Sequence, residues 1–153
     1  MFPSMEKFQT YPPSKLLLLA SILAYLACLP MDSFCTAGNN CSGWPSWSVL
    51  SLGWVEMFLY PIAGISWFAN LALLLAWQNI SLARRKTALR FSVGALVLGA
   101  WFMLVGNVAV SESGSLSAVT GFAPGYWLWL ASMGLAAIGS MQIKPVSLNQ
   151  STT

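Results

Sequence analysis

The chain has 153 residues, of which 57% are hydrophobic and only 7% are charged. A soluble domain normally carries about 25% charged residues, so this composition excludes a water-soluble globule and indicates an integral membrane protein. The net charge of +3 does not indicate nucleic-acid binding, because the positive residues stand beside long apolar runs, where membrane orientation explains them. The chain has no histidine and only four Asp and Glu residues, which argues against general-base catalysis, a metal site or a carboxylate dyad. We therefore expect a protein that is not an enzyme and needs no metal or cofactor.

Four long apolar runs predict an all-α membrane protein, in which four transmembrane helices form one domain over residues 1–153. The predicted spans cover about 16–31, 54–77, 91–110 and 126–143. Outer loops are expected at 32–53 and 111–125, and a cytoplasmic loop at 78–90.

All seven Lys and Arg residues fall on one side of these predicted spans. They are Lys7, Lys15, Arg84, Arg85, Lys86, Arg90 and Lys144. Membrane insertion keeps short Lys- and Arg-rich segments in the cytoplasm. The sequence therefore predicts that both termini are cytoplasmic and that residues 32–53 and 111–125 face outward.

Cys35 and Cys41 lie in the first outer loop with five residues between them. Their placement outside the membrane predicts an oxidising compartment and a disulfide bond. A thiol oxidoreductase is the alternative interpretation. It is disfavoured because the spacing is not Cys-x-x-Cys and the second outer loop has no cysteine to relay electrons.

Glu56 is expected near the outer end of the second span. It begins a polar and aromatic stripe at helical spacing, which consists of Glu56, Tyr60, Ala63, Trp67, Asn70 and Leu74. An ionisable residue at membrane depth is a candidate proton or cation site, which suggests a small oligomeric transporter as an alternative function. A Glu so close to the span end also fits an interfacial position or a partner contact.

The predicted spans contain two other polar groups and several small residues. Asn70 and Asn107 are expected at membrane depth, where each needs a hydrogen-bond partner. Small residues four apart permit close packing of helices, either within the protein or in a homo-oligomer. They are Ala95 and Gly99, and Ser132, Ala136 and Ser140.

Several Trp-rich fragments are found between about residues 40 and 135. They are Ser42-Gly43-Trp44, Leu52-Gly53-Trp54, residues 67–77 and residues 125–132. On these fragments the chain resembles a family of small four-span bacterial inner-membrane proteins with no assigned activity. The resemblance implies the same topology and location, and little chemistry.

Trp and Tyr often dominate the binding energy of protein interfaces. We therefore expect a non-enzymatic protein that binds a protein partner on its periplasmic face, as an immunity protein against a membrane-active toxin or as a subunit of a membrane complex. The predicted binding residues are Trp44, Trp47, Trp54, Glu56, Tyr126 and Trp127.

Overall fold

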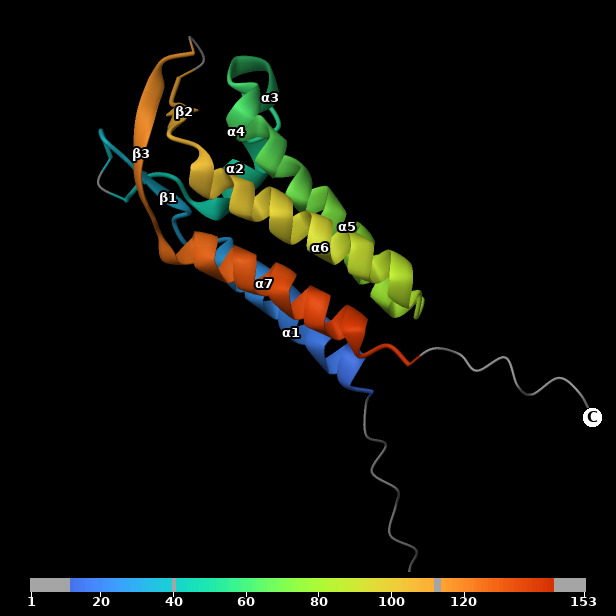
Figure 1. The fold of residues 1–153 in the computed structure, drawn as a ribbon. Coiled ribbons are helices and arrows are strands. Elements are labelled where there is room, and N and C mark those ends of the chain that lie inside the picture. Colours follow the sequence, from blue (N-terminus) through green and yellow to red (C-terminus); the bar gives the residue numbers. More distant parts are fainter. Residues whose placement is uncertain (1–11, 40, 112–113, 145–153) are drawn as a thin grey trace, which may run out of the picture.

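The structure is a computed structural model that describes residues 12–39, 41–111 and 114–144. In these residues four long helices pack side by side: α1 (Pro13–Cys28), α5 (Phe68–Ser81), α6 (Arg85–Trp101) and α7 (Pro124–Met141) (Figure 1). Helix α7 packs against α1 and α6, and α6 also packs against α5.

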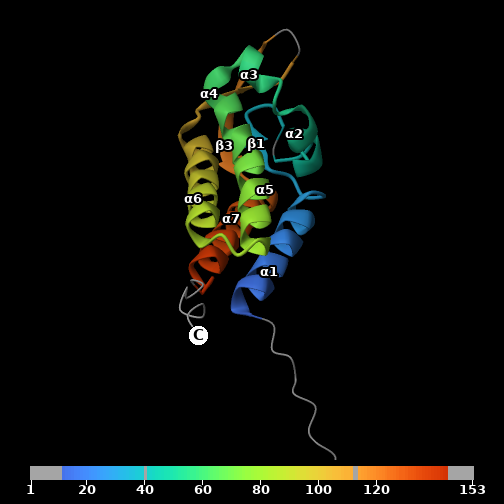
Figure 2. The same ribbon diagram turned by 90° about the vertical axis from the view of Figure 1, so that its right-hand side faces the viewer.

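Short helices and strands lie together at one end of the long helices, as the view turned by 90° also shows (Figure 2). The helices are α2 (Ser46–Leu52), α3 (Glu56–Leu59) and α4 (Pro61–Gly64), with 3₁₀ turns η1 (Ile65–Trp67) and η2 (Phe102–Leu104). The strands are β1 (Phe34–Thr36), β2 (Asn107–Ala109) and β3 (Leu116–Phe122). We call the described residues of 32–60 and 105–123 the cap.

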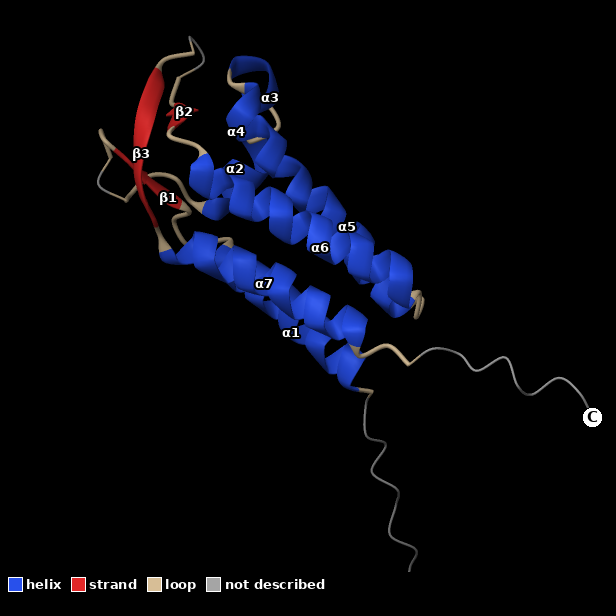
Figure 3. Ribbon diagram, viewed as in Figure 1, coloured by secondary structure: helices blue, strands red, loops and turns tan. Residues whose placement is uncertain are grey.

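The strands of the cap form an antiparallel sheet in the order β1-β3-β2 (Figure 3). Phe34 pairs with Phe122 across β1 and β3, and Asn107 pairs with Ala118 across β2 and β3. The sheet was not expected, because the prediction was all-α, with loops over β1 and β3 and the end of the third span over β2. Thus β1, which precedes α2 in the sequence, joins β2 and β3, which follow α6, in one sheet at the end of the long helices.

The predicted second span, 54–77, is not one continuous helix. Tyr60 has φ −147° and ψ 83°, so it ends α3 and precedes α4. The following Pro61 explains the break, because a residue before proline is pushed from the helical to the extended region. The stripe predicted from Glu56 to Leu74 is therefore wrong as a single helical face.

Two other boundaries also differ from the prediction. The third span was expected to reach Val110, but α6 ends at Trp101 and η2 at Leu104, and the next residues enter β2. The loop expected at 78–90 is reduced to a turn, because α5 continues to Ser81 and α6 begins at Arg85. Lys7 and Glu112 lie outside the described residues.

Within the described part of the chain, two segments are long and apolar enough to cross a membrane: Pro61–Ser81, formed by α4, η1 and α5, and Arg85–Leu104, formed by α6 and η2. Helix α1 is a shorter apolar helix.

The long helices bury small and polar residues together with Leu73 and Met133, and they expose many large apolar ones. The buried polar residues on these helices are Ser21, Asn70, Asn79, Ser92, Ser132 and Ser140. Leu19, Leu74, Val97 and Ile138 are among the exposed apolar residues. The predicted small-residue positions Ala95, Gly99, Ser132, Ala136 and Ser140 are all buried between the helices of one chain.

The Asn70 amide joins three of the long helices. Its Oδ1 accepts hydrogen bonds from Tyr25 Oη of α1 at 3.1 Å and from Trp129 Nε1 of α7 at 2.9 Å. Its Nδ2 donates to the Trp67 carbonyl at 3.0 Å. A second link connects the same pair of helices to α5, since Trp77 Nε1 donates to Ser21 Oγ and Ser21 Oγ donates to the Ser132 carbonyl.

We predict that Asn70→Leu lowers the free energy of unfolding by about 2 kcal/mol, because the Tyr25 and Trp129 donors lose their shared acceptor. Asn79→Leu is the matched control, since Asn79 is also buried on α5 but, among the described residues, its Nδ2 donates only to the Leu75 carbonyl of the same helix. Chemical unfolding in detergent, followed by Trp fluorescence, measures both effects. Equal losses for the two variants would refute the inter-helix role.

Candidate functional site

The disulfide bond expected in the first outer segment is confirmed. Cys35 and Cys41 are linked, with a Cα–Cα distance of 3.9 Å. Cys35 is buried in β1 and pairs with Gly121 of β3, so the bond closes the loop that follows this edge strand. Cys28 of α1 is a free, buried thiol that donates to the Tyr25 carbonyl at 3.0 Å.

An apolar cluster joins the sheet to the ends of the long helices. Phe34, Ala63, Val105 and Val108 form its buried centre. Trp44 packs on Phe34 with ring centroids 5.5 Å apart and an interplanar angle of 20°. Phe34 also contacts Phe102 of η2, with ring centroids 5.4 Å apart, so the cluster connects the Trp44 loop to the turn that follows α6.

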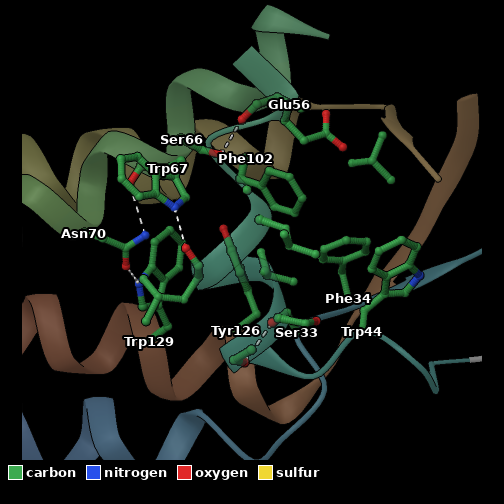
Figure 4. A pocket seen from close by; sticks show the side chains of 18 of the residues that line it. Ser33, Phe34, Trp44, Glu56, Ser66, Trp67, Asn70, Phe102, Tyr126 and Trp129 are labelled. Carbon is green, nitrogen blue, oxygen red and sulfur yellow. Dashed lines mark hydrogen bonds between the residues drawn. The ribbon is translucent and has the colours of Figure 1, made fainter. Parts of the chain in front are cut away.

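A cavity of about 380 Å³ lies between this cluster and the long helices, and we call it the chamber. Its walls come from segments far apart in the sequence, including Tyr25 of α1, Val49 of α2, Asn70 of α5, and Tyr126 of α7. Figure 4 shows Trp67, Asn70 and Trp129 on one side, Phe34 and Trp44 on the other, and Glu56 at the top. The volume is within the range of small-molecule sites in proteins.

Glu56 is a polar group in this largely apolar wall. Its Oε1 accepts a hydrogen bond from the Ala109 backbone N–H at 3.0 Å. Its Oε2 is buried and has no hydrogen-bond partner among the described residues. Burial raises the pKa of Glu56, and the hydrogen bond from Ala109 partly opposes this rise. The side chain thus keeps one buried acceptor without a partner among the described residues.

The six residues predicted to bind a partner separate into two groups. Trp44, Glu56 and Tyr126 line the chamber, and Tyr126 is 2% exposed with its hydroxyl donating to the Gly99 carbonyl at 2.9 Å. Trp47, Trp54 and Trp127 are outside the chamber wall and about half exposed, at 58%, 50% and 53%. The sequence pattern did not distinguish the two groups.

The three polar residues expected inside the membrane also separate. Asn70 lines the chamber and joins helices. Tyr60 is at the break between α3 and α4 and packs against the apolar cluster of the cap. Asn107 is exposed in β2 and does not lie in a helix. The expectation that Asn107 lies in the third helix is therefore wrong, because α6 and η2 end before it.

The sequence interpretation missed Phe58 of the cap. Phe58 is 77% exposed and forms an edge-to-face contact with Trp54, with ring centroids 6.3 Å apart. The signal was present in the Tyr60-Pro61 pair, which indicates a helix break. With α3 separated from α4, Phe58 does not belong to the long apolar segment that begins at Pro61 and is part of the surface of the cap.

Comparisons of the chain with protein-family models, curated proteins and solved structures find no match.

We predict a pH dependence of stability that originates at Glu56. Because its pKa is raised in the folded protein, ionisation of Glu56 favours the unfolded chain. Protonated Glu56 therefore stabilises the folded protein at low pH. This stabilisation is lost as the pH rises from the ordinary pKa of glutamate through the raised pKa of Glu56. Thermal unfolding across this range should show a decline in Tm that Glu56→Gln reduces.

Asp32→Asn is the control for this prediction. Asp32 Oδ1 accepts the Trp44 backbone N–H at 3.0 Å and does not belong to the chamber wall. The Asn variant should keep the decline in Tm seen in the wild type. A decline that Glu56→Gln leaves unchanged would show that another group causes it.

Proposed function

We propose that this chain is a multi-pass bacterial inner-membrane protein with four spans and two cytoplasmic termini, which binds a protein partner at its cap. The four spans in this proposal are α1, Pro61–Ser81, Arg85–Leu104 and α7. At 1.5 Å per residue the two middle segments are about 30 Å long, which matches the hydrocarbon thickness of a bilayer. Helices α1 and α7 are shorter and pack against each other.

The distribution of side chains on the long helices supports this environment. Large apolar residues such as Leu19, Val97 and Ile138 are exposed, whereas Ser21, Asn70 and Ser132 are buried and hydrogen bonded. Water would disfavour the exposed apolar surface. A bilayer would favour both features, because lipid accepts apolar groups and buried polar groups must be paired within the protein.

The position of the positive charges supports the proposed orientation. Lys15 is in the first turn of α1, Arg84 and Arg85 stand where α6 begins, and Lys144 follows α7. These helix ends lie together, away from the sheet (Figures 1 and 2). A positive charge at the start of α6 is unfavourable for the helix dipole. The retention of Lys- and Arg-rich segments in the cytoplasm explains why Arg84 and Arg85 stand at the start of α6.

The exposed pair Trp54 and Phe58 carries the partner-binding proposal. Both residues precede Pro61, where the apolar segment begins, so they lie on the cap. Trp54 is 50% and Phe58 77% exposed. Aromatic side chains that gather on an exposed surface are typical of binding sites. Trp47 of α2 is a further exposed aromatic residue of the cap.

Two kinds of partner fit this surface and the resemblance to small four-span inner-membrane proteins. One is a toxin that acts at the membrane, for which this chain would be the immunity protein. The other is a subunit of a larger membrane complex. In both versions the protein acts by binding and not by catalysis.

Reporter fusions test the proposed orientation of the termini and the cap. Alkaline phosphatase should be inactive when fused after Thr153 and active when fused after Ser111 in a chain truncated there, because the phosphatase folds only outside the cytoplasm. Green fluorescent protein should show the reverse result, with fluorescence only after Thr153. High phosphatase activity after Thr153 would contradict the proposed topology.

We predict that Trp54→Ala with Phe58→Ala reduces capture of a stoichiometric partner by about tenfold or more, since such aromatic residues are worth about 2 kcal/mol or more at an interface. The measurement is affinity purification from native membranes through a tag after Thr153, quantified by mass spectrometry. The readout is the ratio of partner to tagged chain for wild type and variant.

Phe68→Ala is the matched control, because Phe68 is a second exposed Phe but belongs to α5 inside the apolar segment. It should leave capture unchanged. If both variants capture the partner as well as wild type, the surface of Trp54 and Phe58 is not the binding site. Reconstitution of the chain together with its partner in lipid nanodiscs distinguishes direct protein contact from an effect of the substitutions on lipid.

A further inference from the structure

The chamber contains space that the protein itself does not fill. Protein interiors are packed like organic crystals, with few voids larger than a water molecule. The chamber is about 380 Å³, and it is partly open to the outside. Its size is near the lower end of ligand pockets, which favours a small molecule over a two-chain lipid.

Aromatic rings make up much of the chamber wall. Phe34 and Trp44 come from the cap, Phe102 from η2, and Tyr126 and Trp129 from α7. Phe102 contacts both Phe34 and Tyr126, with ring centroids 5.4 and 6.0 Å apart. Such a wall accepts hydrocarbon, and its ring faces also attract a positive charge.

Glu56 supplies the carboxylate of the wall, and the described lining residues include no Lys or Arg to pair with it. Ala109 occupies Oε1, whereas Oε2 is buried and unpaired in the described part of the chain. A buried acceptor without a donor is costly, and native structures rarely keep one without a reason. A ligand with a donor group would complete the site.

We propose that the chamber binds a small hydrophobic amine, whose ammonium group donates a hydrogen bond to Glu56 Oε2 and whose hydrocarbon part lies among the aromatic rings. A cation is the better donor, because its hydrogen bond to a carboxylate is charge-assisted and stronger than that of a neutral hydroxyl. A metal ion fits poorly, since hard cations need several oxygen ligands and the described lining residues include no second carboxylate. This proposal does not depend on partner binding at Trp54 and Phe58.

The test uses three probes of similar shape with different head groups: 2-phenylethylamine, 2-phenylethanol and 3-phenylpropionate. Each is titrated by calorimetry into the full chain in lipid nanodiscs, with empty nanodiscs as the blank. The amine should bind about tenfold or more tightly than the alcohol, and the acid should not bind. This order is measured on the wild-type protein, so the test does not require a variant to fold.

Variants then locate the site. Glu56→Gln should abolish the preference for the amine over the alcohol, since Gln keeps an acceptor but has no charge. Asp32→Asn should retain the preference, because it removes a carboxylate of the cap outside the chamber wall. Val49→Phe, which adds bulk to a half-buried wall residue, should weaken all binding.

Three outcomes would overturn the proposal. Equal affinity for the amine and the alcohol in wild type would remove the role of the charge. An amine preference that Glu56→Gln retains would place the cation elsewhere. No heat of binding for any probe would show that the chamber does not accept this class of ligand. Unchanged partner capture by the variant with Trp54→Ala and Phe58→Ala, together with intact amine binding, would instead contradict only the function proposed for the cap surface.

Discussion

The two hydrogen bonds that Asn70 accepts from other helices are the interaction on which the arrangement of the long helices most depends. Tyr25 of α1 and Trp129 of α7 donate to the same Oδ1, and the amide nitrogen is held by the Trp67 carbonyl. In an apolar environment a helix has little hydrophobic reason to prefer one neighbour, so paired polar groups and close packing of small residues decide which helices meet. The same Asn70 lines the chamber. Its geometry therefore fixes both the helix packing and one wall of the cavity.

A second constraint is the Tyr60-Pro61 pair, which separates the cap from the apolar helix that follows it. Extended backbone at Tyr60 turns α3 back beside α4, and Gly64 makes this possible, because a Cβ there would lie 2.4 Å from the Met57 nitrogen. The turn brings Glu56 to Ala109 of β2, which is 53 residues away in the sequence. The disulfide Cys35–Cys41 closes the loop after β1 on the other side of the sheet. Local breaks in the chain thus assemble the cap from segments on either side of α5 and α6.

The sequence predicted the long helices and the disulfide, because both have strong local signals: apolar runs of helical length and two cysteines outside them. It did not predict the sheet. Residues 107–109 are apolar enough to extend the preceding run, and periodicity alone does not separate a short strand from the end of a helix. The alternation in Leu116–Phe122 was weak, since Ser, Gly and Ala reduce the contrast between the two faces. The pairing of β3 with β1 is a contact between distant segments, which no local pattern specifies.

The division of the Trp-rich residues shows why a candidate site needs the fold as well as the composition. Trp44 and Trp54 have the same chemistry and similar flanking glycines, but Trp44 stacks on Phe34 in the chamber wall and Trp54 contacts the exposed Phe58. The first arrangement lines a cavity that contains a carboxylate, and the second leaves apolar area exposed. Each makes a different demand on a ligand, since an enclosed acid selects by charge and size and an exposed aromatic pair selects by surface shape. The proposed ligand site and the proposed partner surface therefore stand only two residues apart in the chain, at Glu56 and Trp54, yet each depends on contacts with a different part of the fold.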